Sequence, residues 1–390
     1  MALQPNELPG RLRFDDVPAS RSARHEPMKF SIEQIWIDED AQGYPLTRDI
    51  VQKLPEAEVL VGNEFAERSR MLDLEPDPMR RGKRIVRLIK HKGAFVKACP
   101  GTPKYVCCGL EILHIGQGCP MDCRYCALQV YFNRPVLEVF VNVDVLLESL
   151  GKHLEADSQR FHRICTGEFT DSLALNPITG LAPVLVNFFS RQERACLEIK
   201  TKTDLIEPLL GMDPKGRVVL SFSVNAEDIT RIEEIRAAPL ERRIASASRA
   251  QDHGYRIGFH FDPIIPVPGW EQAYSHVIDK IFGLVRPSAI AWISMGVLRF
   301  VPELKEIAGA RFGRIPYFHD GFLRGLDNKS RLHVARRLKI YRTLADTIRM
   351  YSPDSRIYLC MESPDVWEEA LGIRMESDQD LAAYLDAAVS

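Results

Sequence analysis

The sequence contains no hydrophobic stretch that approaches the roughly 20 residues needed to span a bilayer. It also has no excess of one charge, because 51 Lys and Arg residues stand against 53 Asp and Glu residues, for a formal net charge of −2. This balance excludes a histone-like polycation, so any nucleic-acid surface must be a local basic patch. The first ten residues lack a hydrophobic signal core, and we therefore expect a cytoplasmic protein with no membrane partner.

Cysteine is scarce as well, with nine in 390 residues. The odd number and the low density exclude a secreted disulfide scaffold. Six of the nine nevertheless lie between Cys99 and Cys126. Such a cluster in a reducing compartment indicates metal or redox chemistry.

The chain divides into three parts. Residues 1–27 show little periodicity and are predicted to be a disordered tail, followed by an N-terminal extension at 28–105 that packs on a catalytic domain at 106–390. Within the last part, short apolar runs predict strands at 110–115, 161–165, 196–201, 218–224, 256–261, 290–294 and 357–360. Helical patterns lie at 143–154, 240–252, 271–285, 330–350 and 380–388. This alternation predicts an α/β fold, a partial parallel (β/α) barrel of about six units.

The strongest motif is Cys119-Pro-Met-Asp-Cys123-Arg-Tyr-Cys126, directly after the first predicted strand of the barrel. The C-x3-C-x2-C spacing places three thiolates on one turn, which suits three irons of a [4Fe–4S] cluster and leaves the fourth iron open. The alternatives are a zinc site or buried thiols. Zinc usually takes a fourth ligand at a fixed spacing, for which Cys107 or Cys108 would be available. We favour the open cluster, because spacing, position and barrel pattern agree.

This motif resembles that of the radical S-adenosylmethionine (SAM) superfamily. Further segments, in the same order, resemble the spore photoproduct lyase family from about residue 30 to residue 360. They are 118–129, 140–144, 165–166, 201–202, 222–225, 254–259 and 268–271.

The resemblance implies that Cys119, Cys123 and Cys126 hold a [4Fe–4S] cluster whose open iron binds SAM. An electron from a flavodoxin- or ferredoxin-type donor then splits SAM to a 5′-deoxyadenosyl radical. The family uses this radical to split the thymine dimer called spore photoproduct in DNA. Cys165 matches the hydrogen-atom donor to the product radical, and Tyr125 matches a residue of the radical return path.

Four residues at or just after the ends of predicted strands match positions that contact SAM. Gly167 and Glu168 lie where the SAM amine is held, with a solvated turn as the alternative for Glu168. Lys202 and Ser223 match further SAM contacts, and a lysine is suited to the methionine carboxylate.

Three residues depart from the family pattern. Ala127 replaces a second tyrosine of the return path, so either another residue replaces it or SAM is consumed. Gly167 replaces a serine. Asp262 adds a carboxyl group that either pairs with a nearby base or contacts a different substrate.

Two basic segments, 80–92 and 324–342, are candidates for a DNA surface. A lesion-wedging hairpin of the family corresponds to about 322–332, which makes Arg324, Lys329 and Arg331 candidates for phosphate contacts. The alternative is an ordinary solvated helix face.

The remaining cysteines are expected to be structural. We predict buried thiols for Cys99, Cys107 and Cys108, rather than an auxiliary cluster, and core packing for Cys196 and Cys360.

Two other functions stay open. One is a radical SAM enzyme of the same fold that acts on another nucleotide, RNA or peptide, which Ala127, Gly167 and Asp262 favour. The other is a non-enzymatic cysteine-metal protein that binds nucleic acid. Metal analysis separates the latter, because about four iron and four sulfide per chain would exclude it.

Overall fold

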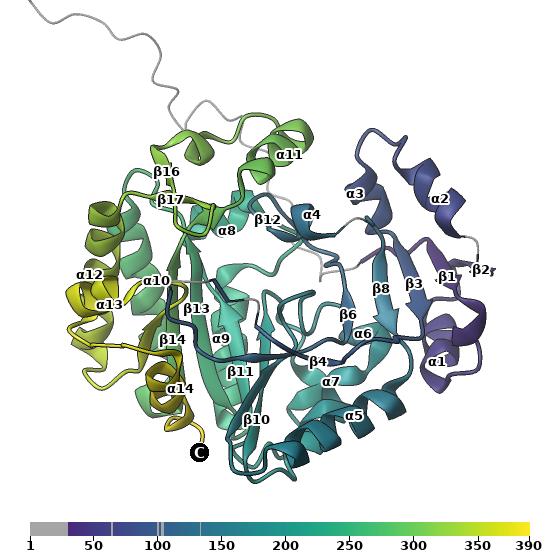
Figure 1. Cartoon of the computed structure of the whole chain (residues 1–390), viewed down its shortest axis with the longest axis horizontal. Coiled ribbons are helices and arrows are strands. Elements are labelled where there is room, and N and C mark those ends of the chain that lie inside the picture. The colour runs from purple at the N-terminus through teal and green to yellow at the C-terminus, as the bar shows by residue number, and fades with distance from the viewer. Residues whose placement is uncertain (1–29, 64, 100, 103–104, 133) are drawn as a thin grey trace, which may run out of the picture.

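A computed structural model describes residues 30–390 except 64, 100, 103, 104 and 133 (Figure 1). The tail predicted at 1–27 lies outside these residues. In the part of the chain that is described, no helix is both long and apolar enough to cross a membrane.

An eight-stranded sheet forms the centre of the catalytic part (Figure 1). Seven of its strands are parallel and follow one another in chain order, which confirms the predicted partial barrel. They are β5 (Glu111–Leu113), β9 (His162–Cys165), β10 (Ala195–Thr201), β11 (Val218–Ser223), β13 (Arg256–Ile264), β14 (Ile290–Val297) and β18 (Ile357–Leu359). The antiparallel strand β4 (Val96–Ala98) closes the β5 edge.

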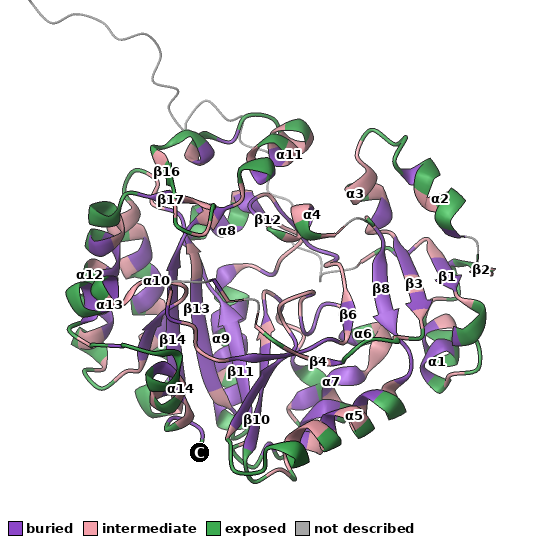
Figure 2. Ribbon diagram, viewed as in Figure 1, coloured by how far each residue is buried: buried purple, intermediate pink, exposed green. Residues whose placement is uncertain are grey.

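Helices cover the outer face of this sheet. Figure 2 shows that the strands are buried and that the helices around them expose their outward faces. The main covering helices are α5 (Val143–Ala156), α7 (Leu181–Phe189), α9 (Leu240–Asp252), α10 (Trp270–Leu284) and α12 (Val334–Tyr351). The helix predicted at 330–350 begins later than expected, which is a correction. Ser330–Leu332 is instead a strand, β17, and the helix starts after His333, whose ring accepts a hydrogen bond from the backbone N–H of Ala335.

A second sheet lies beside the barrel (Figure 1), and the sequence pattern did not predict it. Its strands, in spatial order, are β2 (Glu58–Val61), β1 (Gln34–Ile37), β3 (Ile85–Ile89), β8 (Leu137–Phe140) and β6 (Gly116–Gln117). The first four are mutually parallel. Because β8 follows the cysteine motif yet pairs with β3, the N-terminal segment and the motif segment share one sheet. The predicted division of the chain into an N-terminal extension and a catalytic domain at residue 105 stays a prediction.

The remaining α-helices pack beside the second sheet, near the cysteine loop or near the C-terminus. They are α1 (Pro45–Lys53), α2 (Phe65–Leu72), α3 (Pro78–Gly82), α4 (Leu128–Tyr131), α6 (Asn176–Thr179), α8 (Glu227–Glu233), α11 (Pro302–Phe312), α13 (Pro364–Leu371) and α14 (Asp378–Asp386). The predicted helix at 380–388 begins at Asp378, since Ser377 and Asp380 form a capping box there.

Candidate active site

The cysteine loop lies between β6 and α4 and is held by residues from distant parts of the chain. Its short strand β7 (Asp122–Cys123) pairs with β12 (Glu234–Ile235), so that Cys123 lies opposite Glu234. The Asp122 carboxylate accepts from Lys83 Nζ at 2.8 Å and from Arg311 Nη2 at 2.9 Å. The loop is thus fixed before any cofactor binds.

Two thiols of this loop, those of Cys119 and Cys123, are neutral in the absence of a metal. Burial raises the pKa of Cys119 to about 12 and raises the pKa of Cys123 well above its usual range. A bound metal would remove these protons, because coordination strongly favours the thiolate.

The spacing of the thiols tests the two metal hypotheses. Among the described residues, one trio of His, Cys, Asp or Glu side chains has ligand atoms close enough to share a single ion. That trio lies elsewhere in the fold. One tetrahedral zinc would hold its sulfur ligands roughly 3.8 Å apart, given Zn–S bonds of about 2.3 Å. The three loop thiols do not form such a trio, which disfavours a single zinc ion held by all of them.

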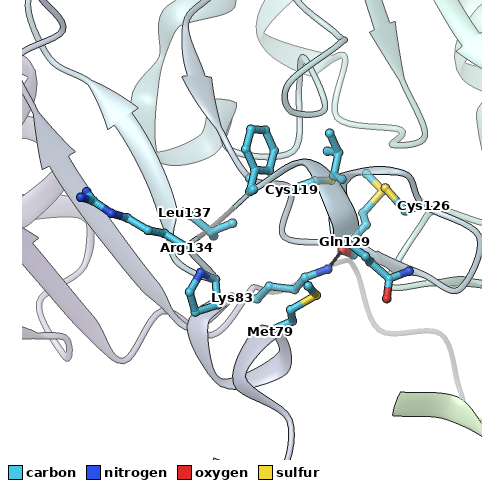
Figure 3. A pocket seen from close by; sticks show the side chains of 12 residues that line it. Met79, Lys83, Cys119, Cys126, Gln129, Arg134 and Leu137 are labelled. Atoms are coloured by element: carbon cyan, nitrogen blue, oxygen red, sulfur yellow. Dashed lines mark hydrogen bonds between the residues drawn. The ribbon is translucent and has the colours of Figure 1, made fainter. Parts of the chain in front are cut away.

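A cavity opens beside this loop (Figure 3). Cys119 and Cys126 line it together with Lys83 and Gln129, and α3 of the N-terminal segment contributes Met79. Lys83 donates to the backbone carbonyl of Met121 as well as to Asp122. The N-terminal segment is therefore one wall of the site.

Cys165 is the last residue of β9 and is completely buried. It lies between Ile112 of β5 and Glu198 of β10 in the sheet register. Burial raises the pKa of its thiol well above the usual range, and its Sγ accepts a hydrogen bond from the Gly167 N–H at 3.2 Å. The structure thus provides a neutral S–H group at the carboxyl end of a barrel strand.

The residues after Cys165 explain one departure from the family pattern. A Cβ atom on Gly167 would lie 2.8 Å from Lys200 Cβ and 3.0 Å from the Lys200 carbonyl oxygen, so a serine does not fit without movement of the backbone. Glu168 forms an ion pair with Lys200 Nζ. Its carboxylate already has a partner, which weakens its prediction as a SAM contact.

A buried ion pair, Glu234 and Arg243, connects three predicted site residues: Tyr125, Lys202 and Ser223. Sequence reasoning missed this pair. The Tyr125 hydroxyl donates to Glu234, and Lys202 Nζ lies 3.9 Å from the same carboxylate. Arg243 completes the pair, since its Nη2 lies 2.6 Å from Glu234 Oε2 and its Nη1 donates to the Ser223 carbonyl at 2.9 Å. No motif marks Glu234 or Arg243 in the sequence.

A second missed cluster lies inside the barrel. Glu198 Oε1 accepts from Ser221 Oγ at 2.5 Å and from Trp292 Nε1 at 3.1 Å, and lies 2.7 Å from His260 Nε2. Burial raises the pKa of Glu198, but His260 and the other donors outweigh burial and lower the pKa to about 2. The sequence signal that could have revealed this cluster is Glu198 itself, an acidic residue within the apolar run of β10.

Asp262 forms the ion pair that was one of its two predicted roles. Its two carboxylate oxygens each lie 3.2 Å from a nitrogen of Arg299, which also contacts Cys360 Sγ at 3.2 Å. Cys360 is therefore part of a polar contact rather than purely apolar packing, whereas Cys196 is fully buried in the core as predicted.

The three candidates for phosphate contacts differ in exposure. They lie on a hairpin of β16 (Phe322–Arg324) and β17, as the resemblance implied. Arg331 is buried, with its Nη2 2.7 Å from Asp327 and its guanidinium over the Tyr105 ring at 4.2 Å. Lys329 is partly buried and lies 3.9 Å from Asp327. Arg324 is exposed, so it is the member of the three with its charge in solvent.

The two basic segments carry less free charge than the sequence suggested. In the first, Arg81 and Arg84 pair with Glu33, Lys83 with Asp122, and Arg87 with Asp38. In the second, Arg336, Arg337, Lys339 and Arg342 pair with Asp320, Glu362, Glu271 and Glu369. In the first segment, Arg80 and Lys90 stay exposed with no ion pair among the described residues, and in the second the residues from Val334 onward lie on a helix. Contact of either segment with DNA stays a prediction.

The extra cysteines are gathered rather than dispersed. Cys99, Cys107 and Cys108 are each partly buried, and Cys108 and Cys99 both act on the Cys107 thiol, whose pKa is raised. This agrees only partly with the prediction of buried thiols, because all three residues are partly exposed.

Comparisons with known proteins agree with this geometry. The family model described as spore photoproduct lyase matches residues 30–313. The spore photoproduct lyase of Bacillus subtilis is 28% identical over 165 residues, which are 42% of this chain and 48% of that protein. The protein of the same name from Clostridium acetobutylicum is 22% identical over 258 residues, 65% of this chain and 74% of that one. The chain thus spans about half the length of the first of these relatives.

Solved structures show the same fold. A mutant spore photoproduct lyase with bound AdoMet and dinucleoside spore photoproduct superimposes with a TM-score of 0.76 at 18% identity, covering 85% of this chain and 100% of that one. A spore photoproduct lyase complexed with dinucleoside spore photoproduct gives a TM-score of 0.75, also at 18% identity, with the same coverage.

Proposed function

Because the chain belongs to the spore photoproduct lyase family, we propose that it is a radical SAM lyase that splits the spore photoproduct in DNA. One observation carries this proposal: a loop of three cysteines lies at the same barrel edge as a buried, neutral thiol. Carboxyl ends of parallel strands are where barrel enzymes concentrate their reacting groups.

Cys119, Cys123 and Cys126 would hold the [4Fe–4S] cluster, and Lys202 and Ser223 would contact SAM. When bound, the cluster and SAM together supply the 5′-deoxyadenosyl radical. Glu234, which pairs with Arg243, contacts both Lys202 and Tyr125. These two side chains are therefore oriented before the cofactors bind.

Cys165 would give its thiol hydrogen to the carbon radical left on the thymine. Its burial supports this role, because a neutral S–H carries the hydrogen that is transferred and the surrounding core excludes competing water. Ala127 offers no phenol for the return path beside Tyr125, so we propose that SAM is consumed as a co-substrate. The Cys165 thiyl radical would then be restored to the thiol by one electron from the electron donor and one proton from solvent. An electron donor of the flavodoxin or ferredoxin type and a cytoplasmic location complete the proposal.

The paired basic segments favour a second candidate, a radical SAM enzyme of the same fold with a nucleotide substrate smaller than duplex DNA. Duplex binding needs several free cations along the phosphate backbone. Most of the arginines and lysines named above are instead neutralised within the fold.

A single anaerobic assay tests these proposals. The reconstituted protein is mixed with dithionite, SAM and either a synthetic spore-photoproduct dinucleotide or a duplex that contains the lesion. We expect thymine monomers with at least one 5′-deoxyadenosine formed per repair event. SAM cleavage without repair of either substrate would contradict the lyase function, and repair of the dinucleotide alone would favour the second candidate. Several repairs per 5′-deoxyadenosine would contradict the consumption of SAM.

A further inference from the structure

A second cluster of metal-type ligands lies at the amino ends of two barrel strands. Glu111 is the first residue of β5, His162 is the first residue of β9, and His153 lies in the last turn of α5. One ligand atom from each of the three lies within 4.8 Å of the other two. His153 Nε2 is 2.8 Å from Glu111 Oε1, and His162 Nδ1 is 2.8 Å from Glu111 Oε2.

The His162 ring supplies an independent argument for a cation. Its Nδ1 faces Glu111, while its Nε2 lies 3.1 Å from the backbone carbonyl of Asp157. A carbonyl can only accept, so this contact places the single proton of a neutral imidazole on Nε2. Nδ1 then directs a lone pair at a carboxylate oxygen, which is repulsive unless a cation or a second proton lies between them. Metal-bound histidines commonly donate their other N–H to a backbone carbonyl in this way.

Burial and charge around the trio suit an ion that enters from one side. Glu111 and His162 are buried, whereas His153 is partly exposed and opens the cluster to solvent. Arg160 Nη1 lies 3.6 Å from Glu111 Oε1, but its side chain is 46% exposed, so it can turn into solvent when an ion binds.

We propose that Glu111, His153 and His162 bind one divalent transition-metal ion, with a further coordination position open to water. Two imidazole nitrogens and one carboxylate oxygen form a donor set that Zn²⁺ and related metals accept. His162 and Cys165 occupy opposite ends of β9, so this site is separate from the cysteine loop and does not depend on the proposed function. An ion there would join α5 to the starts of β5 and β9.

The test uses the full chain with its iron–sulfur cluster loaded, dialysed anaerobically against Zn²⁺. Zinc and iron per chain are measured by mass spectrometry, and zinc X-ray absorption reports the zinc ligands independently of iron. We expect one zinc bound through nitrogen and oxygen. His153→Ala should weaken zinc affinity at least about 100-fold, whereas His276→Ala, at an exposed histidine of α10, should not change it.

Three results would overturn the proposal: no bound zinc in the unsubstituted protein, zinc bound through sulfur, or equal zinc affinity after His153→Ala. Thermal melts of each variant show that it is folded, and the partial exposure of His153 favours a variant that folds. Without zinc binding, the trio is a structural cluster in which both histidines contact Glu111. None of these readouts requires SAM cleavage, so failure here is distinguishable from failure of the lyase proposal.

Discussion

The two ends of strand β9 carry different chemistry although they are only three positions apart. At the carboxyl end, Cys165 is neutral, fully buried and bonded by a single backbone N–H. At the amino end, His162 faces a carboxylate and a carbonyl, both strong acceptors. With a rise of about 3.3 Å per residue, the two positions are about 10 Å apart. One short strand thus presents a group suited to atom transfer at one end and groups suited to ion binding at the other.

The largest effect is expected at the carboxyl end, in the cysteine loop. Cys123→Ala should abolish SAM cleavage, because the cluster would lose one of its three protein ligands. The measurement is 5′-deoxyadenosine formation together with iron content. Full activity in this variant would show that these residues do not hold the cluster. Cys99→Ala, outside the motif, is the control and should keep both values.

Cys165 and Cys196 form a matched pair, because both are completely buried and lie on neighbouring strands. Cys165→Ala should leave SAM cleavage intact but divert the thymine radical to other products, since the hydrogen donor is gone. Cys196→Ala should leave the product distribution unchanged. Chromatography of the products compares them, and an unchanged distribution in Cys165→Ala would contradict its role as donor.

Two arginines of the hairpin should separate burial from exposure. Arg331→Ala leaves the buried Asp327 carboxylate with only the more distant Lys329, at 3.9 Å, and we expect a loss of about 3 kcal/mol in the free energy of unfolding. Arg324→Ala should leave stability unchanged and reduce the slope of log affinity against log salt for an oligonucleotide by about 0.7–0.9, the effect of one phosphate contact. Denaturation curves and salt titrations measure the two effects. An unchanged slope would show that Arg324 does not contact phosphate.

A smaller loss of stability is expected when Gly167 is replaced by serine. Gly167→Ser should cost about 1–3 kcal/mol of stability, because the new Cβ would overlap Lys200. It should also displace the N–H that bonds Cys165, and so change the product distribution. Gly151→Ser on α5 is the control, since a Cβ there meets no atom within 4 Å. Equal stability of the two variants would show that the backbone around Gly167 adapts freely.

The smallest effect on the reaction is expected at the amino end. His153→Ala removes one hydrogen bond to Glu111, worth about 0.5–1.5 kcal/mol of stability. The rate of SAM cleavage should not change, because the cysteine loop lies at the other edge of the sheet. A large fall in that rate would show that the two ends of β9 are coupled.

The sequence was sufficient for the barrel and the cysteine loop, because both have local signals. Each barrel strand is a short apolar run, and the C-x3-C-x2-C spacing is contained within eight residues. The second sheet was missed because β1 and β2 are only four residues long and β8 joins them from far along the chain.

Charge was the least predictable property, since it depends on partners distant in sequence. Arg87 looked like part of a basic patch, but Asp38 lies 49 residues away and neutralises it. The contact between Tyr125 and Glu234 spans 109 residues. No local pattern reveals such pairs, so the residues that orient the predicted site became visible only in the folded chain.

The way the cysteine loop is held has a consequence for how the protein matures. Arg311, which binds Asp122 of the loop, also bonds Asp77 at 2.9 Å and Gln129 at 2.6 Å. During synthesis, the three cysteines therefore leave the ribosome long before β12 and Arg311 exist to arrange them. If these cysteines hold the proposed cluster, we expect iron and sulfide to enter the ordered loop only after about residue 311 has been translated.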